Sequence, residues 1–271
     1  SDVCSSDLKE RLFADAEVAR EKAAPAISML DANSLAYKKL FYGPSEQRSI
    51  DTLERMLGVE QYRKVRDSLR DSGLRTGFTC LFYGTPGTGK TETVYQLAKK
   101  TGRKIIVADV SKLKNCFVGE SEKSLTKLFD DYRKCVQTMD VAPILLFNEA
   151  DAIFGIRQEG AQRAVDKMEN SLQNILLQEM EKLDGILIAT TNLTQNLDKA
   201  FERRFLYKVR FEKPSLETKS KIWSSMMPEL TESQAEELAR EYDFSGGQIE
   251  NISRKKKIQS IIECCDPDFA T

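Results

Sequence analysis

Four short runs of apolar residues recur along the middle of the chain, and helical patterns separate them. The runs are FTCLFY (78–83), KIIVAD (104–109), PILLF (143–147) and GILIAT (185–190). Runs that are this short and almost continuously apolar are typical of strands buried on both faces of a parallel sheet. Between them, apolar residues return at helical spacing, and these are Leu125, Leu128, Phe129, Tyr132, Leu172, Ile175, Leu176, Met180 and Leu183. The alternation predicts an α/β fold built from strand–helix–strand units.

The chain before residue 77 has a helical character. Residues 9–29 are rich in Ala, Glu, Lys and Arg. Residues 46–57 repeat apolar side chains at helical spacing and are stopped by Gly58, and residues 60–71 are expected to form another helix, ended by Gly73. We therefore expect residues 9–76 to be a helical N-terminal segment and linker.

Only helix signals follow the last apolar run, FLYKVRF at 205–211. TESQ at 231–234 and SGGQ at 245–248 both have the capping-box pattern, in which a Ser or Thr and a Gln three residues later satisfy each other's backbone N–H groups. We expect residues 77–212 to form a core domain and residues 213–271 to form a small all-helical second domain.

Composition restricts the chemistry more than the fold. Of the 271 residues, 41% are hydrophobic and 31% are charged, as in ordinary soluble globular proteins. Histidine is absent, which excludes His-based triads, His-ligated metal sites and an imidazole general base. The six cysteines form no C-x-x-C pair, so a zinc or redox site has little support, and free thiols in a reducing, cytoplasmic setting fit best.

Charge and hydropathy argue against two classes of partner. The net charge of −1 gives no general attraction to nucleic acid or to anionic membranes. RKKK at 254–257 is typical of a solvated helix face rather than of a nucleic-acid patch. No run reaches the roughly 18 apolar residues of a membrane span, so we expect no membrane helix.

The first eight residues, SDVCSSDL, look foreign to the rest of the chain. They resemble a translated sequencing-library adapter, and the alternative is a genuine disordered Ser/Asp-rich tail. Neither has a role in the fold. On the first interpretation, we expect the true N-terminus to be missing and the chain to be a fragment of a longer protein.

The clearest chemical motif is GTPGTGKT, which lies directly between an apolar run and a helical pattern. It matches G-x-x-x-x-G-K-[ST], a tight loop whose backbone N–H groups and following helix N-terminus face phosphate oxygens. In such a loop Lys90 reaches the β- and γ-phosphates and Thr91 ligates magnesium. The alternative is a structural glycine-rich turn. The residues expected to bind nucleotide phosphates are Gly84, Thr85, Pro86, Gly87, Thr88, Gly89, Lys90 and Thr91.

Three further motifs follow this loop in order, namely NEAD at 148–151, TTN at 190–192 and AFERRF at 200–205. With the loop, they resemble the AAA ATPases of the group that includes katanin, spastin and the proteasomal ATPases, over roughly residues 77–262. The resemblance implies a P-loop NTPase three-layer sandwich around a five-stranded parallel sheet, followed by a helical lid. It also implies ATP, Mg²⁺ and a hexameric ring that remodels protein substrates.

The resemblance assigns roles to four side chains outside the loop. Glu149 matches the general base that polarises the attacking water. Asn192 matches the sensor-1 position, which helps to place that water, although an Asn after a strand is often only a turn residue. Arg203 and Arg204 match the arginine-finger segment that completes the neighbouring subunit's site. Alternatively, this basic pair only caps a helix C-terminus.

Asn148 departs from the family pattern, which has Asp before the catalytic Glu. Its carbonyl can still accept a hydrogen bond from a magnesium-bound water, but it lacks one negative charge, and its NH₂ group can only donate. Mg²⁺ draws much of its binding from nucleotide phosphates. We therefore expect weaker magnesium binding at Thr91 and Asn148 without loss of the chemistry. The alternative is an inactive nucleotide-binding scaffold.

Two further segments resemble functional parts of the family. NCFVGESEKSL at 115–125 resembles the central pore loop, so Phe117 and Val118 would grip an extended polypeptide by apolar contact, unless Phe117 packs on its own helix. SGGQIENI resembles the lid stretch that approaches adenosine, where Gly246 and Gly247 permit a close backbone approach.

The expected function is ATP hydrolysis by an AAA domain that acts as a homo-oligomeric ring on polypeptide substrates in the cytoplasm. One rival is an ATP-binding scaffold or sensor with little turnover, which Asn148 motivates. The other is a P-loop motor acting on DNA or RNA, against which the near-neutral charge and the lack of an evident basic stripe argue.

Overall fold

A six-stranded sheet lies at the centre of the protein. The computed structural model describes residues 28–108, 110, 120–155, 164–194 and 197–265. The strands are β1 (Ser28–Leu30), β2 (Phe78–Gly84), β3 (Ile105–Ala108), β4 (Ile144–Phe147), β5 (Ile186–Thr191) and β6 (Tyr207–Phe211). Their order across the sheet is β1-β3-β4-β5-β2-β6, and all neighbours are parallel except β1 and β3. The predicted α/β fold with a parallel sheet is confirmed, and each of the apolar runs contains one strand.

Strand β1 corrects two expectations. Ser28 pairs with Val107 and Leu30 pairs with Ile105 in antiparallel register, so this stretch does not continue a helical segment. A strand of three residues is too short to show an alternating pattern in the sequence. The implied five-stranded parallel sheet therefore gains a sixth, antiparallel strand, which pairs with the otherwise open edge of β3.

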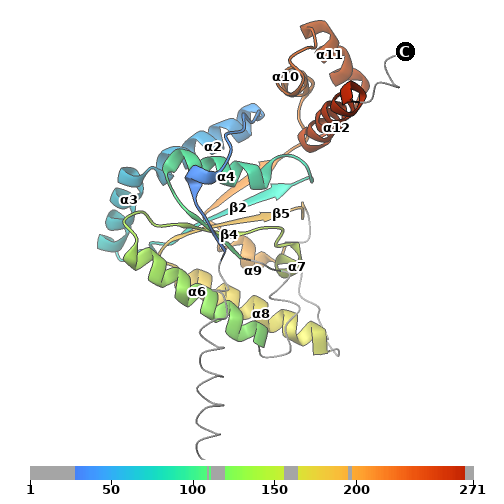
Figure 1. Cartoon of the computed structure of the whole chain (residues 1–271). Helices are drawn as coiled ribbons and strands as arrows, with labels where there is room; N and C mark the ends of the chain where they lie inside the picture. The colour runs from blue at the N-terminus through green and yellow to red at the C-terminus, as the bar shows by residue number, and fades with distance from the viewer. Residues whose placement is uncertain (1–27, 109, 111–119, 156–163, 195–196, 266–271) are drawn as a thin grey trace, which may run out of the picture.

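Helices enclose the sheet on both faces, as a three-layer sandwich requires. In Figure 1, α2 (Pro44–Leu57) and α4 (Lys90–Thr101) lie over one face, with α3 (Val59–Asp71) beside them, and α6 (Glu120–Thr138) and α8 (Ala164–Glu181) cover the other. The apolar stripes predicted within α6 and α8 are buried, except for half-buried Ile175. The shorter helices are η1 (Ala32–Ser34), α7 (Asp151–Phe154) and α9 (Lys199–Glu202).

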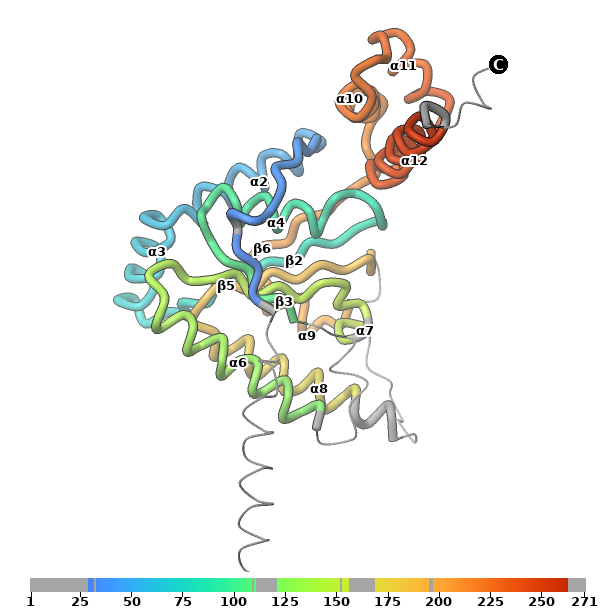
Figure 2. The backbone as a smooth tube through the Cα atoms, in the orientation of Figure 1, coloured from blue at the N-terminus to red at the C-terminus, as the bar shows by residue number. Residues whose placement is uncertain are grey.

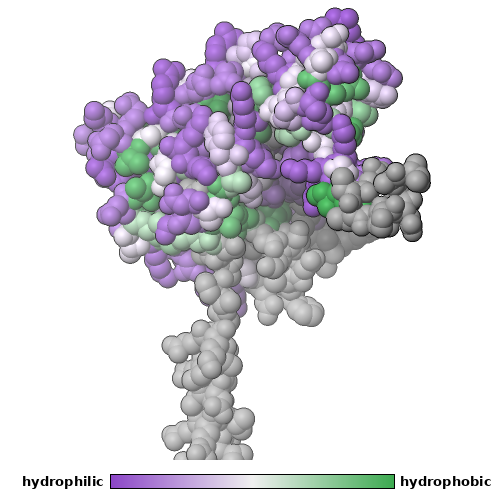
Figure 3. All heavy atoms as spheres, turned by 45° about the horizontal axis from the view of Figure 1, so that its top comes forward, coloured by the Kyte–Doolittle hydropathy of each residue, from purple (hydrophilic) through white to green (hydrophobic). Residues whose placement is uncertain are grey.

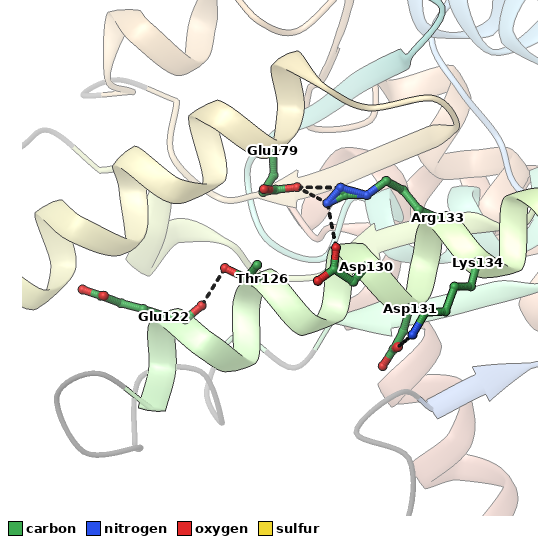
Figure 4. Close-up of polar contacts among 7 residues, drawn as sticks. All are labelled: Glu122, Thr126, Asp130, Asp131, Arg133, Lys134 and Glu179. Carbon is green, nitrogen blue, oxygen red and sulfur yellow. Dashed lines mark hydrogen bonds and ion pairs between the residues drawn. The ribbon is translucent and has the colours of Figure 1, made fainter.

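A charged contact joins α6 to α8 (Figure 4). Arg133 donates to one carboxylate oxygen of Glu179 from Nη1 at 3.3 Å and from Nη2 at 2.7 Å, and Nη2 also lies 3.1 Å from Asp130. The Glu179 side chain is only 9% exposed, so solvent screens this pair less than a surface ion pair. Removing Arg133 would leave the largely buried Glu179 carboxylate without this partner, and the contact therefore helps to fix α6 against α8.

Three helices after β6 form the second domain, and Figure 2 shows them set to one side of the sheet. They are α10 (Leu216–Met226), α11 (Glu232–Glu241) and α12 (Gly246–Cys265). Their own apolar cluster contains Ile222, Trp223, Met227, Ala235, Ala239 and Ile249. Both predicted capping boxes form, because the Gln234 and Gln248 side chains each accept from the backbone N–H of the capping residue, at 2.9 and 2.8 Å.

The side seen in Figure 3 is mostly hydrophilic, and its apolar residues occur in small groups. Among the described residues, no helix combines the length and the apolar character that crossing a bilayer needs.

Candidate functional site

The strand order brings the predicted site residues to one edge of the sheet. Strands β4, β5 and β2 are parallel neighbours, so their carboxyl ends meet at the same edge. β2 leads into the loop at 84–91, β4 is followed by Asn148 and Glu149, and β5 is followed by Asn192. In open parallel sheets, ligands bind at this edge.

The loop after β2 has the backbone of an anion cradle. Gly84, Gly87 and Gly89 have φ of 140°, 75° and 92°, in the region that favours glycine. Gly89 precedes α4, which begins at Lys90. Because the first N–H groups of a helix lack partners within it, the loop and the start of α4 together offer donors to an anion.

All three donors of the Lys90 ammonium are engaged within the protein. Nζ lies 2.9 Å from the carbonyl oxygen of Gly84, 2.8 Å from that of Thr85 and 2.9 Å from Oδ1 of Asn192. Burial lowers the pKa of this ammonium, and the nearby carboxylates of Asp151 and Glu149 oppose that shift. A phosphate that binds Lys90 must therefore replace at least one of these three contacts.

Asn148 accepts two hydrogen bonds on one atom. Its Oδ1 lies 2.6 Å from Oγ1 of Thr91 and 2.9 Å from Oγ1 of Thr190. The carbonyl end of the amide therefore faces the Thr91 hydroxyl. Two neutral oxygens side by side suit Mg²⁺, which prefers oxygen ligands and keeps several waters, provided that phosphates supply the negative charge. Thr91 and Asn148 thus fit the magnesium role predicted for them.

Glu149 has a strained backbone at the mouth of the site. Its φ of 51° is the only positive value of a non-glycine residue in the described ranges. Such a conformation costs on the order of 1 kcal/mol and is often found at functional sites. The Glu149 N–H donates to Oγ1 of Thr190 at 3.0 Å, which helps to hold it. The side chain is exposed and lines the central cavity, where its carboxylate can meet a water molecule.

Asp151 orients Asn192. One of its carboxylate oxygens accepts from the backbone N–H of Asn192 at 2.8 Å, and the other accepts from Nδ2 at 3.3 Å. The Thr191 hydroxyl donates to the same carboxylate. Because Nδ2 is bound to Asp151, Oδ1 of Asn192 points to Lys90. The amide is therefore held in one orientation between an acid and a cation.

A cavity of about 310 Å³ opens beside these residues, at the lower end of the usual range for ligand pockets. The loop, Glu149 and Asn192 form one wall. The rest of the cavity lining comes from residues 38–42 of the N-terminal segment and from residues of α10 and α12. The cavity therefore has a charged part, with Lys90 and Glu149, and an apolar part, to which Phe41, Ile222 and Met226 contribute.

The segment at 38–42 joins the core to the helices α10 to α12, which we call the lid. Lys38 lies 3.5 Å from a carboxylate oxygen of Glu92 on α4 and 3.0 Å from one of Glu250 on α12. Phe41 packs against the apolar cluster of the lid, and the Tyr42 hydroxyl lies 3.0 Å from Oγ1 of Thr93. This segment therefore contacts both the core and the lid beside the cavity.

The lid also touches the loop directly. The Gly247 N–H donates to the carbonyl oxygen of Gly87 at 2.9 Å. A Cβ on Gly87 would lie 2.5 Å from Oγ of Ser245, so no other residue type fits there without displacement. Gly246 and Gly247 both line the cavity.

The two arginines of the finger segment differ. Arg204 is held within its own subunit, with Nη1 at 2.9 Å from the carbonyl oxygen of Ala200 and Nη2 at 2.5 Å from Glu181. Arg203 is exposed, and its side chain has no hydrogen bond or ion pair in the described part of the chain. Neither lines the cavity, so neither can act on a ligand there from the same subunit in this arrangement.

The structure thus brings the loop, Asn148, Glu149, Asn192 and the two lid glycines together. Phe117 and Val118 lie outside the described residues. Sequence reasoning missed Thr190, Asp151 and the segment at 38–42. The first two stand inside TTN and NEAD, where their polar side chains after a strand were the available signal.

Comparison with known proteins gives consistent matches. Residues 80–213 match the model of the ATPase family associated with various cellular activities (AAA). An uncharacterised AAA family ATPase of Sinorhizobium fredii is 32% identical over 159 residues, or 58% of this chain and 45% of the relative. A proteasome-associated ATPase of Streptosporangium roseum is 30% identical over 234 residues, or 76% and 38%. Fidgetin-like protein 1 of Drosophila melanogaster is 27% identical over 198 residues, or 69% and 37%.

The chain covers less than half of the length of each of these three relatives. The matched residues include the phosphate loop, NEAD and TTN, which contribute residues to the cavity wall, and AFERRF, which comes later in the chain. Through residues 80–213, the chain therefore belongs to the AAA family of ATPases.

Proposed function

We propose that the chain binds ATP with Mg²⁺ and hydrolyses it to ADP and phosphate. The observation that carries this proposal is that Lys90, Thr91, Glu149 and Asn192 line one cavity, with Asn148 bound to the Thr91 hydroxyl behind it. A site that only bound ATP, without hydrolysing it, would need no more than the phosphate loop. The exposed Glu149 carboxylate and the fixed Asn192 amide add what is needed to orient and deprotonate a water.

Each group has a distinct task. The backbone of the loop and Lys90 hold the phosphates, and Thr91 and Asn148 hold Mg²⁺, which when bound neutralises charge that develops on the phosphates. Glu149 accepts a proton from the attacking water. Once its bond to Lys90 is exchanged, Oδ1 of Asn192 can accept a hydrogen bond from the attacking water.

The apolar part of the cavity is the proposed adenosine site. Phe41 and Met226 offer apolar contacts, and residues 38–42 supply backbone groups at the cavity wall. Because this wall comes from both the N-terminal segment and the lid, a bound nucleotide would link them. Hydrolysis would then change the fit between lid and core, which is how the chemistry would produce movement.

We also propose that the chain works as a homo-oligomeric ring, a hexamer, on polypeptide substrates in the cytoplasm. Arg203 supports assembly, because it is exposed, has no side-chain partner among the described residues and does not line its own subunit's cavity. Relatives that are named proteasome-associated ATPase and 26S proteasome regulatory subunit 6A support a protein substrate. In such a ring, Phe117 and Val118 would contact the polypeptide.

Asn148 favours a second candidate, an ATP-bound scaffold with little turnover. The amide supplies no charge to Mg²⁺, and its Oδ1 is already shared by two hydroxyls. If magnesium then binds too weakly, the nucleotide would stay intact.

A single-turnover experiment separates the two candidates. Protein in excess over ATP is mixed with Mg²⁺, and phosphate release is followed for the wild type, Glu149→Gln and Asn148→Asp. Hydrolysis by the wild type at least about 100-fold faster than by Glu149→Gln supports the ATPase. A wild type as slow as Glu149→Gln, with Asn148→Asp fast, would establish the scaffold instead.

A further inference from the structure

A second cavity lies at the opposite edge of the sheet from the nucleotide site. It has a volume of about 200 Å³, and it is enclosed by α3, the C-terminal end of α6 and residues 139–142. Arg103 and Ala142, which also line it, lie two residues before the amino ends of β3 and β4. Figure 1 places α3 and the lid at opposite ends of the molecule. The cavity is therefore separate from the site of hydrolysis.

Arg103 is a buried cation without a carboxylate. The residue is 1% exposed, and its guanidinium donates from Nε to the carbonyl oxygen of Leu57 at 2.9 Å and from Nη1 to that of Ala142 at 2.6 Å. The guanidinium also lies 4.7 Å from the centre of the Tyr62 ring. Burial lowers the pKa of Arg103. Two carbonyl oxygens and a ring face meet part of the hydrogen-bonding and stacking capacity of the guanidinium, but they carry no negative charge to compensate its positive charge.

Two further arginines line the same cavity. Arg63 and Arg66, on α3, have no ion pair in the described part of the chain. Arg70 on the same helix is different, because it lies within reach of Asp67 and Asp184. The unpaired arginines of α3 are therefore the ones that face the cavity.

Two buried donors at the cavity also lack partners. The Tyr62 hydroxyl and Nε of Arg66 are buried and make no hydrogen bond to the described residues. Tyr62 is 7% exposed, and the charges of Arg103 and Arg66 act on its hydroxyl by lowering its pKa, against a larger rise caused by burial. Buried donors of this kind cost free energy unless something accepts from them.

We propose that this cavity binds a phosphate-class dianion, either inorganic phosphate or the phosphate group of a small metabolite. Its lining holds the three arginines and one carboxylate, that of Asp140, so two positive charges remain in excess. A phosphate group carries about −1.5 to −2 charges at neutral pH and accepts several hydrogen bonds, which matches both the charge and the unused donors. Guanidinium groups are well suited to phosphate because they can donate in pairs.

The test is a thermal unfolding series in inorganic phosphate at pH 8, with saturating ADP to fill the loop at 84–91. Potassium chloride keeps the ionic strength constant. The wild-type Tm should rise by about 3 °C when phosphate is in tenfold excess over its dissociation constant. Arg63→Gln and Arg66→Gln should remove this rise. Lys64→Gln, an equal loss of charge on the exposed part of the same helix, should retain it.

Two controls decide the chemical class of the bound anion and whether it is inorganic phosphate or a metabolite. Succinate at the same concentration should give no comparable rise, because it is a carboxylate dianion of different shape. A phosphomonoester such as glycerol phosphate that binds more tightly than inorganic phosphate would identify a metabolite as the source. The proposal is overturned if phosphate leaves the wild-type Tm unchanged, if Arg66→Gln keeps the rise, or if succinate acts equally well.

Discussion

Lys90 and Asn192 are joined across the cavity by a hydrogen bond of 2.9 Å between Nζ and Oδ1. The other end of the Asn192 amide is bound to Asp151, so a chain of three side chains connects the phosphate loop to α7. A nucleotide phosphate that replaces the contact between Lys90 and Asn192 would interrupt this row of side chains. The orientation of Asn192 at that moment depends on Asp151.

Asp151→Asn is therefore expected to lower the turnover of ATP by about 10- to 100-fold, because Asn192 would lose its fixed orientation. ATP affinity should change little, since Asp151 is not among the residues that line the cavity. Separate measurements of kcat and of nucleotide dissociation check this. Asp131→Asn, which removes a surface carboxylate paired with Lys134, is the matched control and should leave both values unchanged. An equal loss of affinity and turnover would argue for general damage.

The two arginines of the finger segment should respond differently to substitution. Arg203→Ala should keep the wild-type Tm and lose turnover by about 1,000-fold, because the residue is free to act on a neighbouring site. Arg204→Ala should lower the Tm, because Glu181 and the Ala200 carbonyl lose their partner. Thermal unfolding and ATPase assays of both variants test this. Full activity of Arg203→Ala would remove it from the mechanism.

Gly87→Ala should weaken ADP binding and separate the lid from the loop. A Cβ at this position would lie 2.5 Å from Oγ of Ser245, and φ is 75°. Gly102→Ala is the matched control, because its φ of 64° gives similar backbone strain but nothing lies within 4 Å. Calorimetric titration with ADP should show a loss of affinity for Gly87→Ala alone. Equal effects in both variants would mean that backbone strain, and not the contact with the lid, is responsible.

The lowered pKa of Lys90 predicts how nucleotide affinity depends on pH. Burial disfavours the charged ammonium, so Lys90 in the free protein loses its proton at a lower pH than the usual 10.5. Only the charged form attracts phosphate, so ADP affinity should fall as the pH rises from 8 towards 10. Lys90→Met should bind weakly with little dependence on pH over this range. A decline of the same size in Lys90→Met would assign it to another group.

The sequence predicted the elements whose pattern is local. The strands β2 to β5 are almost continuously apolar because both faces of the sheet are covered, and the stripes of α6 and α8 repeat over several turns. The capping boxes at Thr231 and Ser245 depend on residues three positions apart. The loop at 84–91 is similarly self-contained, since its glycines and Lys90 adjoin the strand and helix that position them.

The parts that could not be predicted depend on contacts between distant segments. Strand β1 exists only because β3 offers an edge, and three residues carry no period of their own. The segment at 38–42 lies at the cavity because Phe41 packs on the lid and Lys38 pairs with Glu250. The different surroundings of Arg203 and Arg204 likewise follow from Glu181, which is far from them in sequence.

The most direct test of the proposed activity is the steady-state ATPase rate per subunit as a function of protein concentration, with Glu149→Gln in parallel. With the proposed mechanism, the wild-type rate should climb with concentration, because a neighbour supplies Arg203, and the rate of Glu149→Gln should nearly vanish at every concentration. A wild-type rate that equals that of Glu149→Gln throughout, while ATP still binds, would contradict it.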